Sequence, residues 1–247
     1  MTALRKLIRV ETKLFLREPV GAFFGIAFPA VLILVLGLAL PGFRDPADEL
    51  GGKRPVDIYL PITMTLAIAT VTMVTLLGVL SGYRERGVLR RLSTTPVSPV
   101  ALLGAQLVVN VGALLAGCAL AWAVAAAVFD VPPPGNLAGF ILAFTLGASA
   151  MCTVALLVAA VTPSARASSG VGSLVYFPMM FFAGVWTPGP AMPDTIRRIA
   201  DFTPLGAASQ SVQSAWSGAW PTPLHLGVMV AFTVLLGALA ARHLRWD

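Results

Sequence analysis

Six long apolar stretches divide the chain, and short polar or charged segments separate them. The stretches cover residues 20–40, 58–80, 100–128, 136–161, 169–187 and 223–241. A helix needs about 20 apolar residues to cross the hydrocarbon core of a bilayer, where the backbone must satisfy its own hydrogen bonds. The pattern therefore predicts an all-α integral membrane protein, with six transmembrane helices in a single transmembrane domain over residues 1–247.

The composition agrees with this pattern and narrows the function. Hydrophobic residues make up 57% of the 247 residues and charged residues 11%, whereas soluble domains hold about 25% charged residues. The six apolar stretches contain no Lys, Arg, Asp or Glu. Ionisable residues at membrane depth usually mark proton relays, ion paths or catalysis. The chain is therefore not expected to be a proton-coupled carrier or an intramembrane hydrolase.

The sequence also has no phosphate-binding loop of the G-x-x-x-x-G-K-[ST] type. We therefore expect no ATP hydrolysis by this chain, no directly bound cofactor or metal, and no enzymatic activity of its own. If the protein moves a substrate uphill, the energy has to enter through another protein.

The distribution of Lys and Arg predicts the orientation. The segments on the side of the N-terminus hold 12 of these residues and the segments on the other side hold 5. Cytoplasmic loops are enriched in Lys and Arg. Six crossings with both termini in the cytoplasm fit this asymmetry.

Residues 1–19 predict a basic amphipathic helix at the inner membrane surface. Arg5, Arg9 and Lys13 follow one another at four-residue steps, while Glu11 falls among the apolar residues of the opposite face. A carboxylate at that place needs a partner. Three interpretations stay open: a cation on the protein that the helix contacts, a distorted helix, or a plain electrostatic anchor with Glu11 at its edge.

The connection between the second and third stretches combines charge with apolar residues. Residues 83–95 predict a short cytoplasmic helix that ends before Pro96, and an exposed helix of this kind favours docking on a partner. The candidate docking residues are Arg84, Glu85, Arg86, Val88, Leu89, Arg90, Arg91 and Leu92. The alternative is a connection that is basic only because it is cytoplasmic.

Between the fifth and sixth stretches, residues 188–222 contain two weakly apolar pieces of about a dozen residues each. Such pieces are too short to cross a bilayer. They predict short outer helices, interfacial or re-entrant, with a disordered outer loop as the alternative.

Several of these features together resemble the membrane subunit of type 2 ABC exporters, in particular bacterial permeases of the daunorubicin-resistance and polysaccharide-export group. The stretch "RERGVLRRLSTTPVSP" is similar to the family's Glu-Arg-x-x-Gly-x-Leu-x-x-Leu-x-x-x-Pro pattern, although Glu85 and Gly87 are one residue closer together than in some versions. The stretch "MPDTIRRIADFTPLGAASQSVQSAW" is similar to the family's outer helices before the last span. The order of elements along the whole chain also matches.

The resemblance implies a role for each segment. Residues 83–95 would be the coupling helix in a groove of a separate ATP-binding subunit, and residues 4–17 the connecting helix beside it. Two permease copies, as a homodimer in a bacterial plasma membrane, would work with two ATP-binding subunits that hold ATP and Mg. Membrane lipids would be further partners, and no nucleic acid is expected.

The resemblance further implies a central cavity lined by the second and fifth spans of both copies. The substrate-pathway candidates there are Thr65, Thr72, Phe177, Met180 and Phe181. Family members export lipophilic drugs, including antibiotics, or lipids or lipid-linked glycans, and the modest number of aromatic residues favours a lipophilic cargo. From the residues alone, the threonines also suit helix-to-helix contacts, and the Met and Phe side chains equally suit packing against lipid.

Two other classes of function stay open at this point. A membrane-embedded lipid-modifying enzyme would need a cluster of acids, His or Arg, and Asp130, Asp194 and His225 show no useful spacing. A non-transporting membrane scaffold that recruits a cytoplasmic protein would also suit the basic inner segments.

Overall fold

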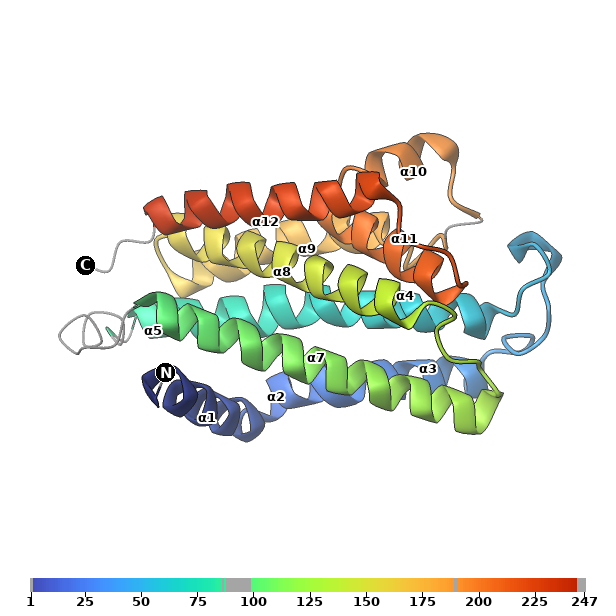
Figure 1. The fold of residues 1–247 in the computed structure, drawn as a ribbon, viewed down its shortest axis with the longest axis horizontal. Coiled ribbons are helices and arrows are strands. Elements are labelled where there is room, and N and C mark those ends of the chain that lie inside the picture. Colours follow the sequence, from blue (N-terminus) through green and yellow to red (C-terminus); the bar gives the residue numbers. More distant parts are fainter. Residues whose placement is uncertain (1, 86, 88–98, 189–190, 244–247) are drawn as a thin grey trace.

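The computed structural model describes residues 2–85, 87, 99–188 and 191–243. This part of the chain is a bundle of helices, shown in Figure 1. The one pairing of extended backbone in it joins Ala47 to Lys53 in the loop after the first apolar helix. The prediction of an all-α fold is therefore confirmed for the described residues.

Five helices in this part of the chain are long and apolar enough to cross a membrane. The first runs over Pro19–Ala39 and consists of α2 (Pro19–Ala22), the π-helical segment η1 (Phe23–Ala27) and α3 (Phe28–Ala39). The second runs over Pro55–Glu85 and consists of α4 (Pro55–Thr70), the π-helical segment η3 (Val71–Leu76) and α5 (Leu77–Glu85). The others are α7 (Pro99–Phe129), α8 (Leu137–Val161) and α12 (Pro223–His243). They overlap the first, second, third, fourth and sixth apolar stretches.

The expected fifth span is the shorter helix α9 (Ala165–Phe182), which does not meet the same criterion of length and hydropathy. Its 18 residues begin before the apolar stretch and include Arg166 and three serines. Ser164 caps its start by accepting from the Ala167 N–H at 3.2 Å. Its end comes at Gly184, which has a left-handed φ of 84°, and the Val185 N–H reaches back to the Met180 carbonyl at 3.3 Å. The count of six spans is thus not confirmed, and five are found.

Although α9 does not meet that criterion, it runs along the bundle beside the longer helices. Figure 1 shows α8 and α9 side by side, with their connection at the end of the bundle near α5 and with α10 (Asp194–Ala200) beyond the opposite end of α9. The start of α1 (Thr2–Arg17) and the end of α12 lie at the same end of the bundle as the end of α5.

The helix from α4 to α5 forms the centre of the bundle, and α3, α7, α8 and α9 pack around it. Leu60, Met64 and Ile68 are fully buried along it. Its threonines donate mostly to carbonyls of their own helix, as Thr65 does to Pro61 at 2.9 Å. The hydroxyls of Thr63, Thr65, Thr70 and Thr72 are thereby satisfied inside the core.

Small residues allow the first span to approach its neighbours closely. A Cβ atom on Gly21 would lie 2.7 Å from the Thr75 Cγ2 atom of η3, and one on Gly117 of α7 would collide with the Gly25 carbonyl oxygen. Both contacts involve the π-helical segments, where the helix is locally widened. Gly21 and Gly117 therefore hold α2, η1, η3 and α7 in close contact.

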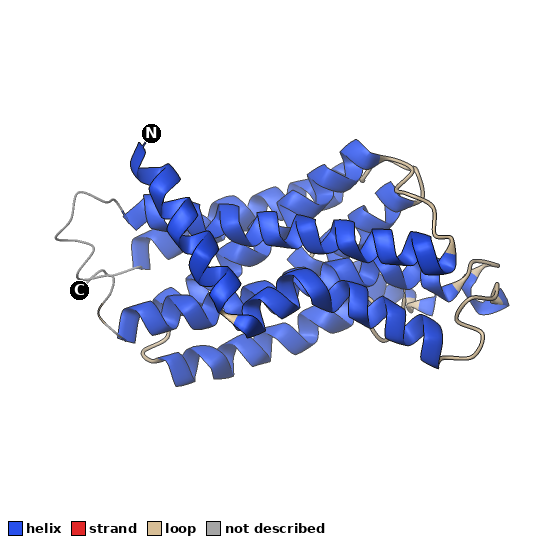
Figure 2. Cartoon of the chain, turned by 90° about the horizontal axis from the view of Figure 1, so that it is seen from below, coloured by secondary structure: helices blue, strands red, loops and turns tan. Residues whose placement is uncertain are grey.

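Two elements lie outside this set of long helices. Figure 2 shows α1 lying obliquely across the bundle, where it packs on α7. Between α9 and α12, the chain forms α10 and α11 (Pro204–Trp216). The α11 helix begins at Thr203, whose hydroxyl accepts from the Gly206 N–H at 3.2 Å, and it is largely buried against α8 and α4. The alternative of a disordered loop over residues 188–222 is therefore wrong for the described residues in that range.

Candidate functional site

The end of α5 is the part of the predicted docking segment that the structure describes. The helix continues without a break through Tyr83 and Arg84 to Glu85. It ends there because Gly87 takes a left-handed φ of 63° and its N–H bonds to the Arg84 carbonyl at 3.0 Å. Residues 83–85 of the predicted docking helix are thus the last three residues of α5, and the helix predicted over residues 83–95 stays a prediction. The docking candidates Arg86, Val88, Leu89, Arg90, Arg91 and Leu92 lie outside the described residues.

Arg84 and Glu85 connect α5 to the turn between α8 and α9. Arg84 donates from Nη1 to the Thr162 carbonyl at 2.7 Å and to the Ala159 carbonyl at 3.2 Å, at the C-terminal end of α8. Glu85 Oε1 accepts from the Ala165 N–H at 2.7 Å, at the start of α9. A cation at a helix C-terminus and an anion at an N-terminus both oppose the partial charges of the helix ends. Both side chains remain exposed to the outside as well.

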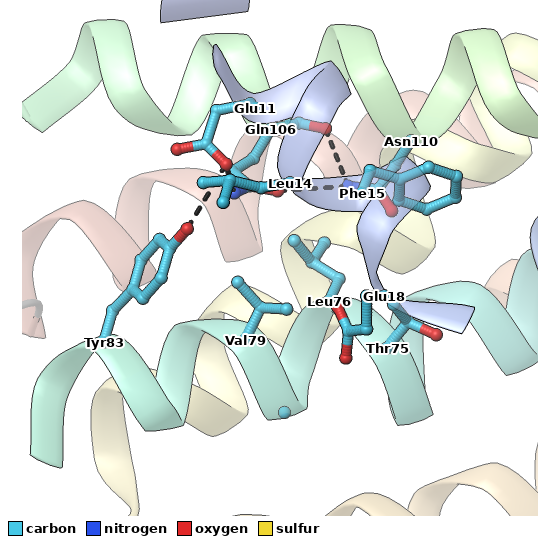
Figure 3. A pocket seen from close by; sticks show the side chains of 11 residues that line it. Glu11, Leu14, Phe15, Glu18, Thr75, Leu76, Val79, Tyr83, Gln106 and Asn110 are labelled. Atoms are coloured by element: carbon cyan, nitrogen blue, oxygen red, sulfur yellow. Dashed lines mark hydrogen bonds between the residues drawn. The ribbon is translucent and has the colours of Figure 1, made fainter. Parts of the chain in front are cut away.

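Glu11 lies where α1 meets α5 and α7, and only 6% of its surface is exposed. Its Oε2 atom accepts from Gln106 Nε2 at 2.6 Å and from the Tyr83 hydroxyl at 3.3 Å, as Figure 3 shows. Burial raises the pKa of the Glu11 carboxyl above its usual value, and the Tyr83 hydrogen bond lowers it by less. The partners given by the described residues are neutral donors and not the cation that one interpretation expected.

The buried face of α1 differs from the one expected for a plain electrostatic anchor. Glu11 and Phe15, four residues apart, are buried together, whereas Leu14 is exposed. Arg5, Arg9 and Lys13 are exposed, in agreement with a basic outer face. The helix is continuous over Thr2–Arg17. Glu11 is therefore neither at the edge of the contact nor in a distorted helix.

A pocket of about 360 Å³ opens beside Glu11. Its polar wall includes Glu18 of the α1–α2 connection, Thr75 of η3, and Gln106 and Asn110 of α7, and its apolar wall includes Phe15 (Figure 3). Tyr83, Gln106 and Asn110 were not predicted as site residues. The Gln106 and Asn110 side chains share one face of the third span at a four-residue spacing, which was the signal that could have pointed to them.

A family model described as "ABC-2 type transporter" matches residues 2–216. The chain belongs to the ABC-2 type transporter family. It is a membrane permease without an ATPase domain in the matched family region, and permeases of this family work with an ATP-binding subunit. No curated protein matches the chain significantly.

In this ABC-2 permease, the predicted substrate-pathway residues fall into two separate groups. Thr65 and Thr72 are fully buried in the central helix, and their hydroxyls donate to the Pro61 and Ile68 carbonyls at 2.9 and 2.8 Å. Phe177 on α9 is 59% exposed. The two groups therefore do not line one open path within a single copy.

Met180 and Phe181 follow Phe177 toward the end of α9 and are partly buried, with Phe181 against the ring of Trp186. The polar link between the second span and α9 comes from other residues. Thr70 and Tyr176 share a hydrogen bond of 2.9 Å between their hydroxyls. This pair joins the two elements that the family resemblance assigns to the cavity.

The permease also holds a polar cluster at its other end. His225 at the start of α12 lies 3.0 Å from Asp201 Oδ1, which also accepts from Gln210 Nε2 at 2.7 Å. Sequence spacing showed no partner for His225, so this pairing corrects the expectation of scattered groups. No cluster of three or more His, Cys, Asp or Glu residues suited to a metal occurs in the described part of the chain.

Proposed function

We propose that this permease is the transmembrane subunit of an ATP-driven exporter. Two copies pair with two ATP-binding subunits and pass a lipophilic drug, a lipid or a lipid-linked glycan across a bacterial plasma membrane by alternating access. ATP and Mg are held by the partner subunits. Membership of the ABC-2 family supports the transport class, since the permease works with a separate ATP-binding subunit.

One observation carries the proposed coupling mechanism. The end of α5 is bonded to both sides of the α8–α9 turn, through Arg84 to α8 and through Glu85 to α9. A force on the segment after α5 would therefore reach α5, α8 and α9 together. In the proposed cycle, residues 83–95 receive that force from the ATP-binding subunit and the basic α1 lies beside them.

The proposed topology has six crossings with both termini in the cytoplasm. The start of α1, the end of α12, the end of α5 and the α8–α9 turn share one end of the bundle (Figure 1). This end also carries the larger number of Lys and Arg residues. In this topology α9 is the fifth span, and its exposed residues Leu174 and Phe177 face the second copy and the cargo.

Copurification with the ATP-binding subunit tests the transport class. The permease should be coexpressed with the ATPase encoded beside it, and a stable complex is expected whose ATP hydrolysis depends on the ATPase. The purified permease alone should hydrolyse no ATP. Strong hydrolysis by the permease alone, or failure of the two proteins to copurify, would contradict the proposal.

Substitutions in the docking segment test the coupling. Leu89→Asp and Glu85→Arg should abolish transport while the permease still inserts in the membrane. Asp45→Arg, a charge reversal in the loop at the opposite end of the bundle, is the matched control and should keep transport. If both docking variants transport and assemble like the original protein, the docking role is wrong.

Cysteine labelling tests the topology. In a background without the buried Cys118 and Cys152, a Lys53→Cys variant should react with an impermeant maleimide added outside intact cells. An Arg5→Cys variant should react only after the membrane is permeabilised. The reverse pattern would place the start of α1 on the outer side of the membrane and would contradict the proposed mechanism.

A further inference from the structure

The pocket beside Glu11 is distinct from the proposed transport path along α9. It lies between α1, the η3–α5 part of the second span and α7 (Figure 3). One wall is apolar, with Leu14, Phe15 and Val79, and the other is polar. Leu14 at the rim is exposed, so the pocket is connected to the outside of the bundle. A ligand with one polar and one apolar part fits such walls.

The hydrogen bonds of the polar wall fix the direction of its amides. Gln106 donates from Nε2 to the Glu11 carboxyl, which turns Gln106 Oε1 toward Asn110. Asn110 donates from Nδ2 to the Gln106 carbonyl at 2.8 Å and to Gln106 Oε1 at 3.4 Å. In this series of hydrogen bonds, the Gln106 amide donates to Glu11 and the Asn110 amide donates to Gln106. The remaining acceptor is the Asn110 Oδ1 atom.

Asn110 Oδ1 is left without a hydrogen-bond donor among the described residues. The Asn110 side chain is 2% exposed and lines the pocket. The hydroxyl oxygen of Thr75, a residue that is 6% exposed, is likewise without a partner there. A buried polar atom without a partner costs about 1–3 kcal/mol, so such an atom is usually satisfied by another protein group, an ordered water or a ligand. Asn110 Oδ1 can only accept and the Thr75 hydroxyl can accept as well, so a ligand that donates hydrogen bonds would satisfy both atoms.

The acidic side chains of the pocket favour a ligand with a positive charge. Glu11 and Glu18 both line it, and neither forms a salt bridge within the described part of the chain. A buried carboxylate is stabilised by a nearby cation. The pocket has two carboxylates, and the described residues form no cluster of three or more side chains that could bind a metal ion. An organic cation fits this set of oxygens better than a metal ion does.

We propose that this pocket binds a primary ammonium group carried by an amphiphile. The ammonium has three N–H donors and no acceptor, which suits a lining that offers acceptor oxygens on Asn110, Glu11 and Glu18. The apolar part of the ligand lies along Phe15 and Val79. The ammonium belongs either to the ethanolamine headgroup of a membrane lipid or to a free amphiphilic amine. This site does not depend on the proposed transport function.

Binding of hexylammonium tests the proposal. The permease in phosphatidylcholine nanodiscs should be titrated with hexylammonium chloride by calorimetry, with empty nanodiscs subtracted and 1-hexanol as the neutral analogue. Saturable binding of one hexylammonium per chain is expected, with binding of hexanol at least tenfold weaker. Equal binding of the two, or no saturable binding of hexylammonium, would overturn the proposal.

Three variants separate the site from general effects on folding. Glu11→Gln and Asn110→Leu should each weaken hexylammonium binding about tenfold or more, and Glu18→Gln, at the exposed rim, by a few-fold. Asp45→Asn, a carboxylate removed from a distant loop, is the control that should bind normally. If Glu11→Gln or Asn110→Leu does not fold, Glu18→Gln decides alone, and unchanged affinity in that variant overturns the site.

Lipid composition identifies the source of the ammonium. If the headgroup of a lipid fills the pocket, replacing part of the phosphatidylcholine by phosphatidylethanolamine should weaken hexylammonium binding to the original protein but not its residual binding to Glu11→Gln. Unchanged binding would assign the site to free amines. Both results keep the ammonium site, whereas a gain in hexylammonium affinity with phosphatidylethanolamine would contradict it.

Discussion

Arg84 and Glu85 are neighbours in the chain, yet they bind opposite sides of one turn. Arg84 donates to the Thr162 carbonyl at the end of α8, and Glu85 accepts from the Ala165 N–H at the start of α9. Each charge lies at the helix end whose partial charge it opposes. The last turn of α5 thus contacts two other helices, α8 through a positively charged side chain and α9 through a negatively charged one.

Replacing Arg84 should loosen the end of α8. Arg84→Ala removes two charged hydrogen bonds to carbonyls, and because the side chain is largely exposed, we expect a loss of about 1 kcal/mol. Such a loss corresponds to a fall of roughly 2–4 °C in Tm for a protein of this size. Thermal unfolding followed by tryptophan fluorescence measures it. Lys53→Ala, the loss of an exposed cation in the loop before α4 whose side chain has no hydrogen bond or ion pair with the described residues, should leave Tm unchanged.

Glu85 should contribute through both its oxygen and its charge. Glu85→Gln keeps an acceptor for the Ala165 N–H and should cost a few tenths of a kcal/mol, about the size of a helix-end charge effect. Glu85→Ala removes the acceptor too and should cost about 1 kcal/mol. Tm values for the two variants give the comparison. Equal losses in both would show that the hydrogen bond to α9 is unimportant.

The stability of the protein should depend on the charge of Glu11. Its folded-state pKa is raised, mainly by burial, so folding is unaffected by this group below its ordinary pKa of about 4.5 and is weakened as pH rises through the raised folded value. Each unit of raised pKa corresponds to about 1.4 kcal/mol. Tm should therefore decline over this window in the original protein.

Glu11→Gln should remove that decline. The variant carries a neutral side chain of the same size, so it should match the original protein at the acidic end and become the more stable of the two as pH rises. Tm measured from pH 4.5 to 8 in both proteins checks this. A variant whose Tm difference from the original protein does not grow with pH would contradict the raised pKa.

The hydrogen bond between Thr70 and Tyr176 should stabilise the contact of the central helix with α9. Tyr176→Phe removes the bond of 2.9 Å and should cost about 0.6 kcal/mol, the average for polar pairs between membrane helices, with an upper value of about 1.7 kcal/mol. Tyr59→Phe is a matched control, because the Tyr59 hydroxyl has no hydrogen bond with the described residues. A loss of the same size in both variants would mean that the Thr70 bond contributes nothing.

Much of the fold could be predicted because its signals are local. Apolar stretches of sufficient length mark Pro19–Ala39 and Leu137–Val161 directly. The weak point was α9, where Arg166 and the serines at its start lower the hydropathy of a helix that nevertheless extends along the bundle. The composition changes at residue 83, but the second span continues as a helix to Glu85, because the local pattern does not mark the residue at which a helix ends.

The candidate site was predicted only in part. Glu11 stood out because a carboxylate on an apolar face needs a partner. Its partners Tyr83 and Gln106 are separated from it by 72 and 95 positions along the chain, so no spacing could reveal them. The same holds for Arg84, whose acceptors lie 75 and 78 positions away.

The sequence by itself determined that this chain is helical and belongs in a membrane, because hydropathy acts on each segment separately. The tertiary structure alone decided which polar groups meet: Glu11 with Gln106, Arg84 with the end of α8, and Thr70 with Tyr176. These contacts depend on how helices far apart in the chain are packed, since a hydrogen bond needs its two atoms within about 3 Å. Hydropathy limits which segments can be buried together, but it does not select the pairs of side chains that bond between them.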